Sequence, residues 1–227
     1  MKLDASFELL HAEELLIRLA EKFGNKAALS TSLSWEDQVI THYIFSNRLP
    51  IRVFTLDTGR IFPETYSVLN STRERYQQNI EVFFPQAETV QKLLTQKGAN
   101  SFYESVENRK ECCHIRKVEP LNRALQGVEC WITGIRAEHS ENRSALPVID
   151  FDDTRNIHKI NPLAKWTLEE VKSVIKQFNI PYNTLHDKGF VSIGCQPCTR
   201  AIRQGEDFRA GRWWWEQSDK KECGLHT

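Results

Sequence analysis

The chain has 227 residues, with 30 basic and 30 acidic side chains and a formal net charge of zero. A chain of this size can form a core without disulfide bonds, and a neutral charge does not favour nucleic-acid binding. No segment approaches the about 20 apolar residues of a membrane span, and the acidic N-terminus does not resemble a signal peptide. We therefore expect one cytoplasmic domain over residues 1–227, with no nucleic-acid or membrane partner.

Helices and strands are predicted to alternate from the start of the chain. A helix is expected from about Phe7 to Phe23, where Gly24 and Asn25 end it. The small apolar run 27–32 and the segment 51–57 are predicted strands, with a helical pattern from Trp35 between them. Pro63 suits the first turn of the next helix, residues 63–76.

The same alternation continues towards the C-terminus. A strand is predicted over residues 80–85, a helix over 87–98, a helical stretch over 111–126 with a break near Pro120, and a strand over 130–136. Thr167 and Glu170 form a capping box at the start of a helix over 167–178. Apolar strands that alternate with helices predict an α/β fold, with a mostly parallel twisted sheet covered by helices on both faces.

Three predicted strands end in polar segments. These end segments are residues 30–32, 57–59 and 133–136. The carboxyl ends of parallel strands lie at one edge of a sheet, where ligands of α/β proteins bind. A ligand of nucleotide size is therefore expected at this edge.

Four of the six cysteines carry the most specific pattern. Cys112 and Cys113 are adjacent, and Cys195 and Cys198 form a CxxC motif. Adjacent thiolates reach one zinc ion poorly, whereas each can bind its own iron in a cluster. An iron–sulfur cluster is thus favoured over structural zinc and over four unligated core thiols.

The remaining cysteines and the aromatic run are less specific. Cys130 begins a predicted strand and is expected in the core. Cys223 lies near the C-terminus, where Lys220 and Lys221 would favour its thiolate, and an incidental surface cysteine is the alternative. The three tryptophans 213–215 are expected to be part core and part lid rather than a platform for bases. Among the basic residues close to the paired cysteines and the CxxC motif, about half are expected to lie on a solvated face.

The segments ECCHIRKVEPL, TGIR, NTLHDKGFVSIGCQPCTR, GRWWWE and KKECGLH together resemble the assimilatory adenylyl-sulfate (APS) reductases, from about residue 25 to the C-terminus. The resemblance implies a fold related to the ATP pyrophosphatases, of the adenine-nucleotide hydrolase type. It also implies the reduction of APS to sulfite and AMP with electrons from a separate thioredoxin-like protein. By resemblance, Cys112, Cys113, Cys195 and Cys198 hold a 4Fe-4S cluster, and Cys223 is the nucleophile on a mobile tail, residues 216–227.

The same resemblance proposes a substrate site. The segment SLSWED takes the place of the phosphosulfate loop, although it lacks a glycine that many relatives have and is one residue shorter. The number of subunits stays open, and a homo-oligomer is among the alternatives. The implied substrate contacts are Ser32, Ser34, Asp37, Leu56, Asp57, Lys117, Arg136, Arg209 and Arg212.

Three other functions are weighed against this one. Reductases of phosphoadenylyl sulfate (PAPS) share the tail but typically lack the four cysteines. A nucleotide sensor held by a cluster or zinc would need no nucleophile on its tail. An ATP pyrophosphatase would need an SGGxDS-type phosphate loop, which SLSWED is not.

Overall fold

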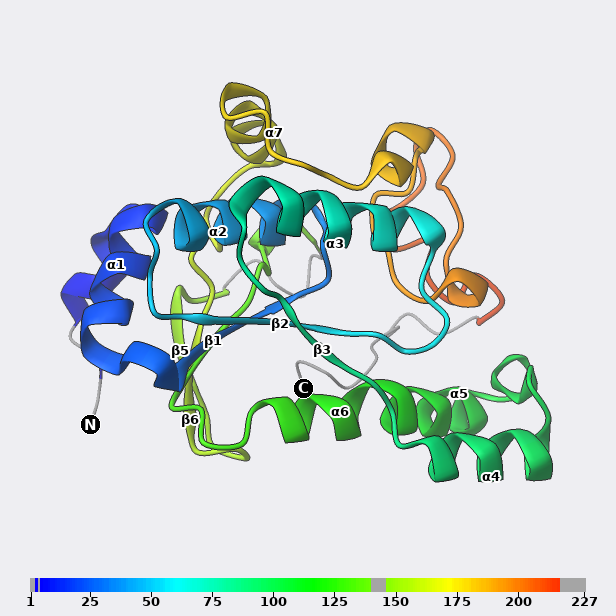
Figure 1. The fold of residues 1–227 in the computed structure, drawn as a ribbon. Helices are drawn as coiled ribbons and strands as arrows, with labels where there is room; N and C mark the ends of the chain where they lie inside the picture. Colours follow the sequence, from blue (N-terminus) through cyan, green and yellow to red (C-terminus); the bar gives the residue numbers. More distant parts are fainter. Residues whose placement is uncertain (1–2, 4, 140–145, 217–227) are drawn as a thin grey trace. The chain divides into compact units, whose positions relative to one another are not determined.

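A computed structural model describes residues 3, 5–139 and 146–216, and it confirms the predicted α/β class (Figure 1). Six strands form one sheet in the order β3-β2-β1-β4-β6-β5. The pairs β1–β2, β1–β4 and β4–β6 are parallel, and β5 pairs antiparallel with β6. Helices flank this mostly parallel sheet, as the alternation of elements predicts.

The strands are β1 (Ala27–Thr31), β2 (Arg52–Leu56), β3 (Glu81–Phe83), β4 (Cys130–Ile132), β5 (Ile149–Asp152) and β6 (Ile157–Ile160). Strand β4 has a parallel neighbour on each side, and all of its residues are buried, as is typical of parallel strands with both faces covered. Cys130 is its first residue and is 0% exposed, so the expected core position of this thiol is confirmed.

The described chain divides into two compact units, each made of several segments. The first unit comprises the described residues within 1–55, 64–81 and 127–184, and the second comprises those within 56–63, 82–126 and 185–227. The single domain expected over residues 1–227 stays a prediction, and each unit is described by itself below.

The first unit contains most of the sheet and the helices α1 (Ala12–Phe23), α2 (Trp35–Ser46), α3 (Pro63–Tyr76) and α7 (Leu168–Gln177). Leu15, Leu16 and Leu19 of α1 are completely buried in its core. Gln38 on α2 donates to the hydroxyl of Thr72 on α3 at 2.8 Å, so these two helices lie side by side (Figure 1). Burial of these apolar faces is what makes the helices stable.

The second unit contains α4 (Ala87–Lys97), α5 (Val106–Cys113) and α6 (Glu119–Ala124). A π-helical turn over His114–Val118 joins α5 to α6 without a break. Pro120 is the second residue of α6, which directly follows this π-helical turn. The helical stretch is thus confirmed, but the irregularity lies just before Pro120, in the turn that contains Arg116 and Lys117.

Two local predictions were wrong in their extent, and one element was missed. The predicted helix 7–23 is interrupted, because His11 has an extended backbone between a 3-10 turn over Ala5–Leu9 and α1. The predicted strand 130–136 ends at Ile132, and the chain then turns out of the sheet. The hairpin of β5 and β6 was not predicted at all, and it adds the antiparallel edge of the sheet.

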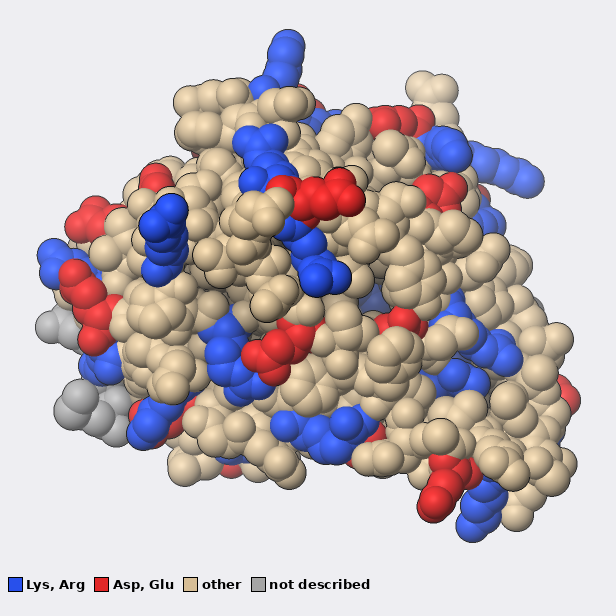
Figure 2. Space-filling model, in the orientation of Figure 1, with Lys and Arg blue, Asp and Glu red and all other residues tan. Residues whose placement is uncertain are grey.

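The surface matches the neutral composition. Figure 2 shows Lys and Arg side chains interspersed with Asp and Glu over the visible face. Within the described residues, no helix combines the length and the apolar character that a membrane crossing requires.

Candidate functional site

Four cysteines that are far apart in the sequence line one cavity in the second unit, here called the cysteine cavity. Cys112 and Cys113 come from the end of α5, and Cys195 and Cys198 come from the CxxC turn 82 residues later in the chain. The predicted gathering of these residues is therefore present. The other residues that line the cavity are Arg60, Phe102, Arg109, Arg116, Lys117, Pro197 and Trp213.

The CxxC motif forms a tight turn that fixes both of its thiols. The Cys198 amide donates to the carbonyl of Cys195 at 2.9 Å across a 3-10 turn, Gln196–Cys198. The Thr199 hydroxyl donates to the same carbonyl at 2.9 Å. The hydroxyl of Thr58 lies 3.2 Å from the sulfur of Cys195, where either atom can donate. The chain after β2 therefore holds the first thiol of the motif directly.

A short antiparallel contact brings Arg212 and Trp213 to this motif. Thr199 and Arg212 form an isolated bridge, and the Trp213 amide donates to the carbonyl of Cys198 at 3.2 Å. Gly194 lies against the Arg212 guanidinium, so a Cβ at this residue would require that side chain to shift. Trp213 is only 1% exposed, so part of the tryptophan run belongs to the core, as expected.

The charges around the cavity act differently on its thiols. Burial would raise the pKa of Cys195, but Lys117, the Thr58 hydroxyl, Arg212 and Arg116 together lower it below the ordinary value of a thiol. Burial raises the pKa of Cys198 to about 12, and the neighbouring Cys195 adds to this rise. Burial also raises the pKa of Cys112. The basic side chains thus favour at least one thiolate in this cavity.

Three buried N–H groups beside these thiols have no hydrogen-bond partner within the part of the chain that the structure describes. They are Nε of Arg116, Nε of Arg212 and Nε1 of Trp213. Buried donors are almost always satisfied, so such a group indicates an acceptor that completes the site. Four thiols surrounded by cations and unused donors fit an anionic, sulfur-rich group. Among the described residues, no set of three or more His, Cys, Asp or Glu side chains is arranged to hold a single metal ion.

Most of the predicted basic substrate contacts also lie in the second unit. Lys117 and Arg212 are buried, and the guanidinium groups of Arg212 and Arg209 lie 4.9 and 5.9 Å from the Trp213 ring. Asp57 is buried and accepts the Gly59 amide at 2.8 Å, which shapes the turn after Leu56 at the end of β2.

The predicted phosphosulfate loop lies in the first unit, between β1 and α2, and it is organised around Asp37. The amide and the hydroxyl of Ser32 each donate to Oδ2 of Asp37 at 2.6 Å, and the Ser34 hydroxyl lies 3.4 Å from the same oxygen. Leu33 adopts a positive φ of 61° between the two serines. A Cβ at Gly134 would overlap the Asp37 carboxylate, so only glycine leaves room for it.

Burial of Asp37 has an electrostatic consequence. Burial raises the pKa of this carboxyl group to about 6, and the charge of Glu36 adds to the rise, while the hydrogen bonds from Ser32 and Ser34 oppose it. The structure therefore brings Ser32, Ser34 and Asp37 together, as predicted. Their contacts are with one another, and their roles as substrate contacts stay predictions.

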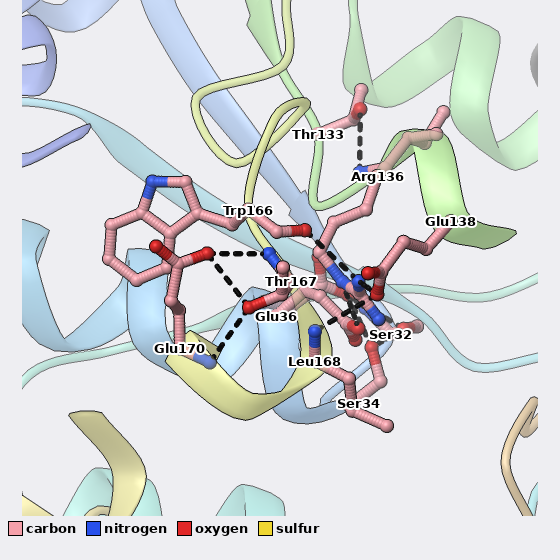
Figure 3. A network of polar contacts seen from close by, with 12 residues as sticks. Ser32, Ser34, Glu36, Thr133, Arg136, Glu138, Trp166, Thr167, Leu168 and Glu170 are labelled. Carbon is pink, nitrogen blue, oxygen red and sulfur yellow. Dashed lines mark hydrogen bonds and ion pairs between the residues drawn. The ribbon is translucent and has the colours of Figure 1, made fainter. Parts of the chain in front are cut away.

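Arg136 lies in the same unit as this loop, but its guanidinium is bound by carboxylates (Figure 3). It is 1% exposed, its Nε donates to Glu36 at 2.8 Å, and its Nη1 pairs with Glu138. Glu138 also accepts the Leu168 amide at 3.0 Å, which ties this network to the start of α7. Arg136 thus links segments of the first unit through these carboxylates, and its role in substrate binding stays a prediction.

Sequence reasoning missed several residues of the cysteine cavity. Arg60 and Arg109, which line the cavity, were not singled out, although Arg109 precedes Cys113 by four residues, about one helical turn. Thr58 was expected only as a polar residue at the end of a strand. The Arg60 guanidinium lies 5.0 Å from the Phe102 ring. Cys223, the predicted nucleophile, lies outside the described residues.

The fold and the site define an α/β protein with a cavity that four cysteines and several basic side chains line. The phosphoadenosine phosphosulfate reductase domain matches residues 26–201 of this chain. An adenosine 5'-phosphosulfate reductase of Burkholderia cepacia is 52% identical over 225 residues, which cover 99% of this chain and 89% of the relative. The chain belongs to the phosphoadenosine phosphosulfate reductase domain family.

Solved structures agree with the fold. A phosphoadenylyl-sulfate reductase from Candida auris, in its phosphate complex, superposes with a TM-score of 0.73 at 28% identity and covers 89% of this chain and 99% of its own. A Candida glabrata FMN adenylyltransferase superposes with a TM-score of 0.57 at 14% identity, over 100% of this chain and 80% of its own. The second likeness shows the fold alone.

Proposed function

We propose that this protein is an adenylyl-sulfate reductase, an oxidoreductase that converts APS to sulfite and AMP in sulfate assimilation. The observation that carries the proposal is the cavity that Cys112, Cys113, Cys195 and Cys198 line together. The extensive identity to the Burkholderia cepacia reductase supports the same substrate.

In the proposed reaction, the thiolate of Cys223 attacks the sulfur of APS. The S–O bond to the phosphate breaks, AMP leaves with that electron pair, and Cys223 becomes an S-sulfocysteine. A dithiol protein of the thioredoxin type then attacks the Cys223 sulfur, and sulfite leaves. The second thiol of the donor resolves the mixed disulfide, so the donor is oxidised by two electrons and the Cys223 thiol is restored.

The cations of the second unit suit the first step. Charge builds on the phosphate oxygens of the leaving AMP as the S–O bond breaks, and fixed cations stabilise such a transition state. Lys117 and Arg212 are buried and therefore preorganised for this role, whereas Arg209 is partly exposed. We assign all three to the phosphosulfate of APS.

The four cysteines would hold a 4Fe-4S cluster. Thiols provide both electrons of the reaction, so the cluster need not transfer electrons. When bound, it would supply a fixed charge and a cross-link between α5 and the CxxC turn. The unused donors of Arg116, Arg212 and Trp213 support such an anionic, sulfur-rich group, since N–H donors bind its sulfurs. A reducing compartment, the cytoplasm, suits thiol chemistry of this kind.

The test is sulfite formation by the anaerobically purified protein with thioredoxin and either APS or PAPS. We expect APS to be used with the much higher kcat/KM, because the predicted site reserves no basic residue for a 3′-phosphate. Equal kcat/KM values would contradict the assigned substrate. No sulfite from either nucleotide, with APS still bound, would indicate a binding protein instead of a reductase.

A further inference from the structure

A buried ion pair joins the helix of the cysteine pair to the last described residue of the chain. Arg109 on α5 donates from Nε and Nη2 to the two carboxylate oxygens of Glu216, at 2.8 and 3.0 Å. The two side chains are only 2% and 4% exposed. A two-pronged contact between a guanidinium and a carboxylate fixes orientation as well as distance, and burial protects it from solvent.

Arg109 also contacts the cysteine cavity. It lines that cavity, and its guanidinium lies 4.5 Å from the Trp213 ring. One side chain therefore lines the cysteine cavity and also binds Glu216.

Glu216 lies close in the sequence to the predicted nucleophile, Cys223. Glu216 precedes Cys223 by seven residues. A fully extended chain of that length spans at most about 25 Å, so the covalent chain keeps the backbone of Cys223 within this distance of Glu216. The backbone is fixed there as well, because the Glu216 amide donates to the carbonyl of Trp213 at 2.9 Å.

We propose that Arg109 is a positioning residue for the reaction, which anchors the base of the nucleophile-bearing tail at Glu216 and ties that anchor to the cysteine cavity. This inference rests on the role proposed above for Cys223. Without the anchor, the point from which the chain runs to Cys223 would no longer be fixed by Arg109, and we expect the thiol to reach the sulfur of APS less often. The binding of APS itself would not change, because Glu216 contributes no cation to it.

The experiment compares Glu216→Gln with Glu206→Gln under anaerobic conditions. Glu206 is a matched control, since it also binds an arginine through both carboxylate oxygens, at 2.7 and 3.0 Å, in the same unit. That pair is partly exposed, because the side chains of Arg200 and Glu206 are 35% and 28% exposed to solvent. Three quantities are measured in each protein: iron per chain, the Kd for APS, and the single-turnover rate at which APS without reductant forms the adduct on Cys223.

In Glu216→Gln, we expect adduct formation to slow by at least about tenfold, as misplaced reacting groups do, with iron content unchanged and the Kd within about twofold. Glu206→Gln should match the wild type in all three quantities. Iron loss in parallel with the slower rate would show that the pair only supports the cavity, and an unchanged rate would also overturn the proposal.

Glu216→Asp keeps the buried charge, and it replaces Glu216→Gln in the experiment if Glu216→Gln does not fold. It shortens the side chain by one methylene, so the rate should fall with full iron content. An unchanged rate in this variant would again contradict the anchoring role. Failure of the proposed function is separately visible, because the wild-type protein would then form no adduct at all.

Discussion

The hydroxyl of Thr58 lies 3.2 Å from the sulfur of Cys195, and both residues are buried. The same hydroxyl accepts the Arg60 amide at 3.2 Å, and the Thr58 carbonyl accepts Nη1 of Arg116 at 2.6 Å. The turn after β2 is therefore held to the CxxC motif and to the turn that follows the cysteine pair. One small residue connects the three segments that surround the cysteine cavity.

This connection predicts the effect of Thr58→Val. The variant keeps the shape of the side chain but leaves the Arg60 amide without its acceptor, which costs about 1–3 kcal/mol of stability. It also removes the partner of Cys195, so we expect the protein to lose iron faster than the wild type in the presence of a chelator. Thr72→Val is the control, because Thr72 is a buried, hydrogen-bonded threonine of the first unit. An equal rate of iron loss in Thr58→Val and the wild type would contradict this role of Thr58.

The four cavity cysteines predict a second result. Replacement of any one of Cys112, Cys113, Cys195 or Cys198 by serine should reduce both the iron content and the sulfite formed, because each thiolate binds one iron. Cys130→Ala is the control, since Cys130 lies in the first unit, and burial in the core raises its pKa. Iron and acid-labile sulfide per chain are the measurements. Full iron content in the Cys112 or Cys113 variant would exclude that residue as a ligand.

Part of this arrangement could be predicted from the sequence, because some signals are local. The capping box of Thr167 and Glu170 is present at the start of α7, since it needs only residues three positions apart. The paired cysteines and the CxxC motif were informative for a similar reason, because their close spacing restricts what they can bind.

Other features depend on contacts between distant segments and left no local signal. The Thr58–Cys195 contact spans 137 positions in the sequence, and the Arg109–Glu216 pair spans 107. The hairpin of β5 and β6 was missed although Asn156, which has a positive φ of 55°, marks its turn. The run 130–136 looked like one strand because its residues are mostly apolar, but Gly134 leaves the sheet where the Asp37 carboxylate needs space.

The contact between Gly134 and Asp37 predicts a third result. In Gly134→Ala the new methyl group would overlap the carboxylate, so we expect a loss of about 1–3 kcal/mol in stability, typical of overpacked cores. Asp37→Ala in the same chain removes the obstacle, and the double variant should be less destabilised than the sum of the single variants. Urea unfolding of the four proteins measures this coupling. Additive losses would show that the two residues do not compete for space.

Asp37 also predicts a dependence on pH. Its pKa is raised by burial from 3.8 to about 6 in the folded protein, so the folded state binds the proton more tightly than the unfolded chain. This stabilisation is complete below pH 3.8 and is lost as the pH rises through about 6. The loss is on the order of 3 kcal/mol, because a tenfold difference in proton affinity between the two states corresponds to about 1.4 kcal/mol.

The comparison with Asp37→Asn isolates this effect, because asparagine does not ionise. Between pH 4.5 and 7.5, about the range in which Asp37 titrates, the wild type should lose thermal stability relative to the variant as the pH rises. Scanning fluorimetry at a series of pH values measures the difference between the two midpoints. A constant difference over this range would show that Asp37 does not titrate there.

The proposed attack of Cys223 on the sulfur of APS would change the mass of the intact protein, which mass spectrometry measures. With APS and no reductant, the wild type should release one AMP per chain and gain about 80 Da, the mass of one SO₃ group held in a covalent intermediate. Peptide mapping should place this group on Cys223, and reduced thioredoxin should remove it as sulfite. Cys223→Ser should bind APS with a similar Kd but form no adduct. An adduct on Cys130 or on a cavity cysteine, or bound APS with no adduct in the wild type, would contradict the account.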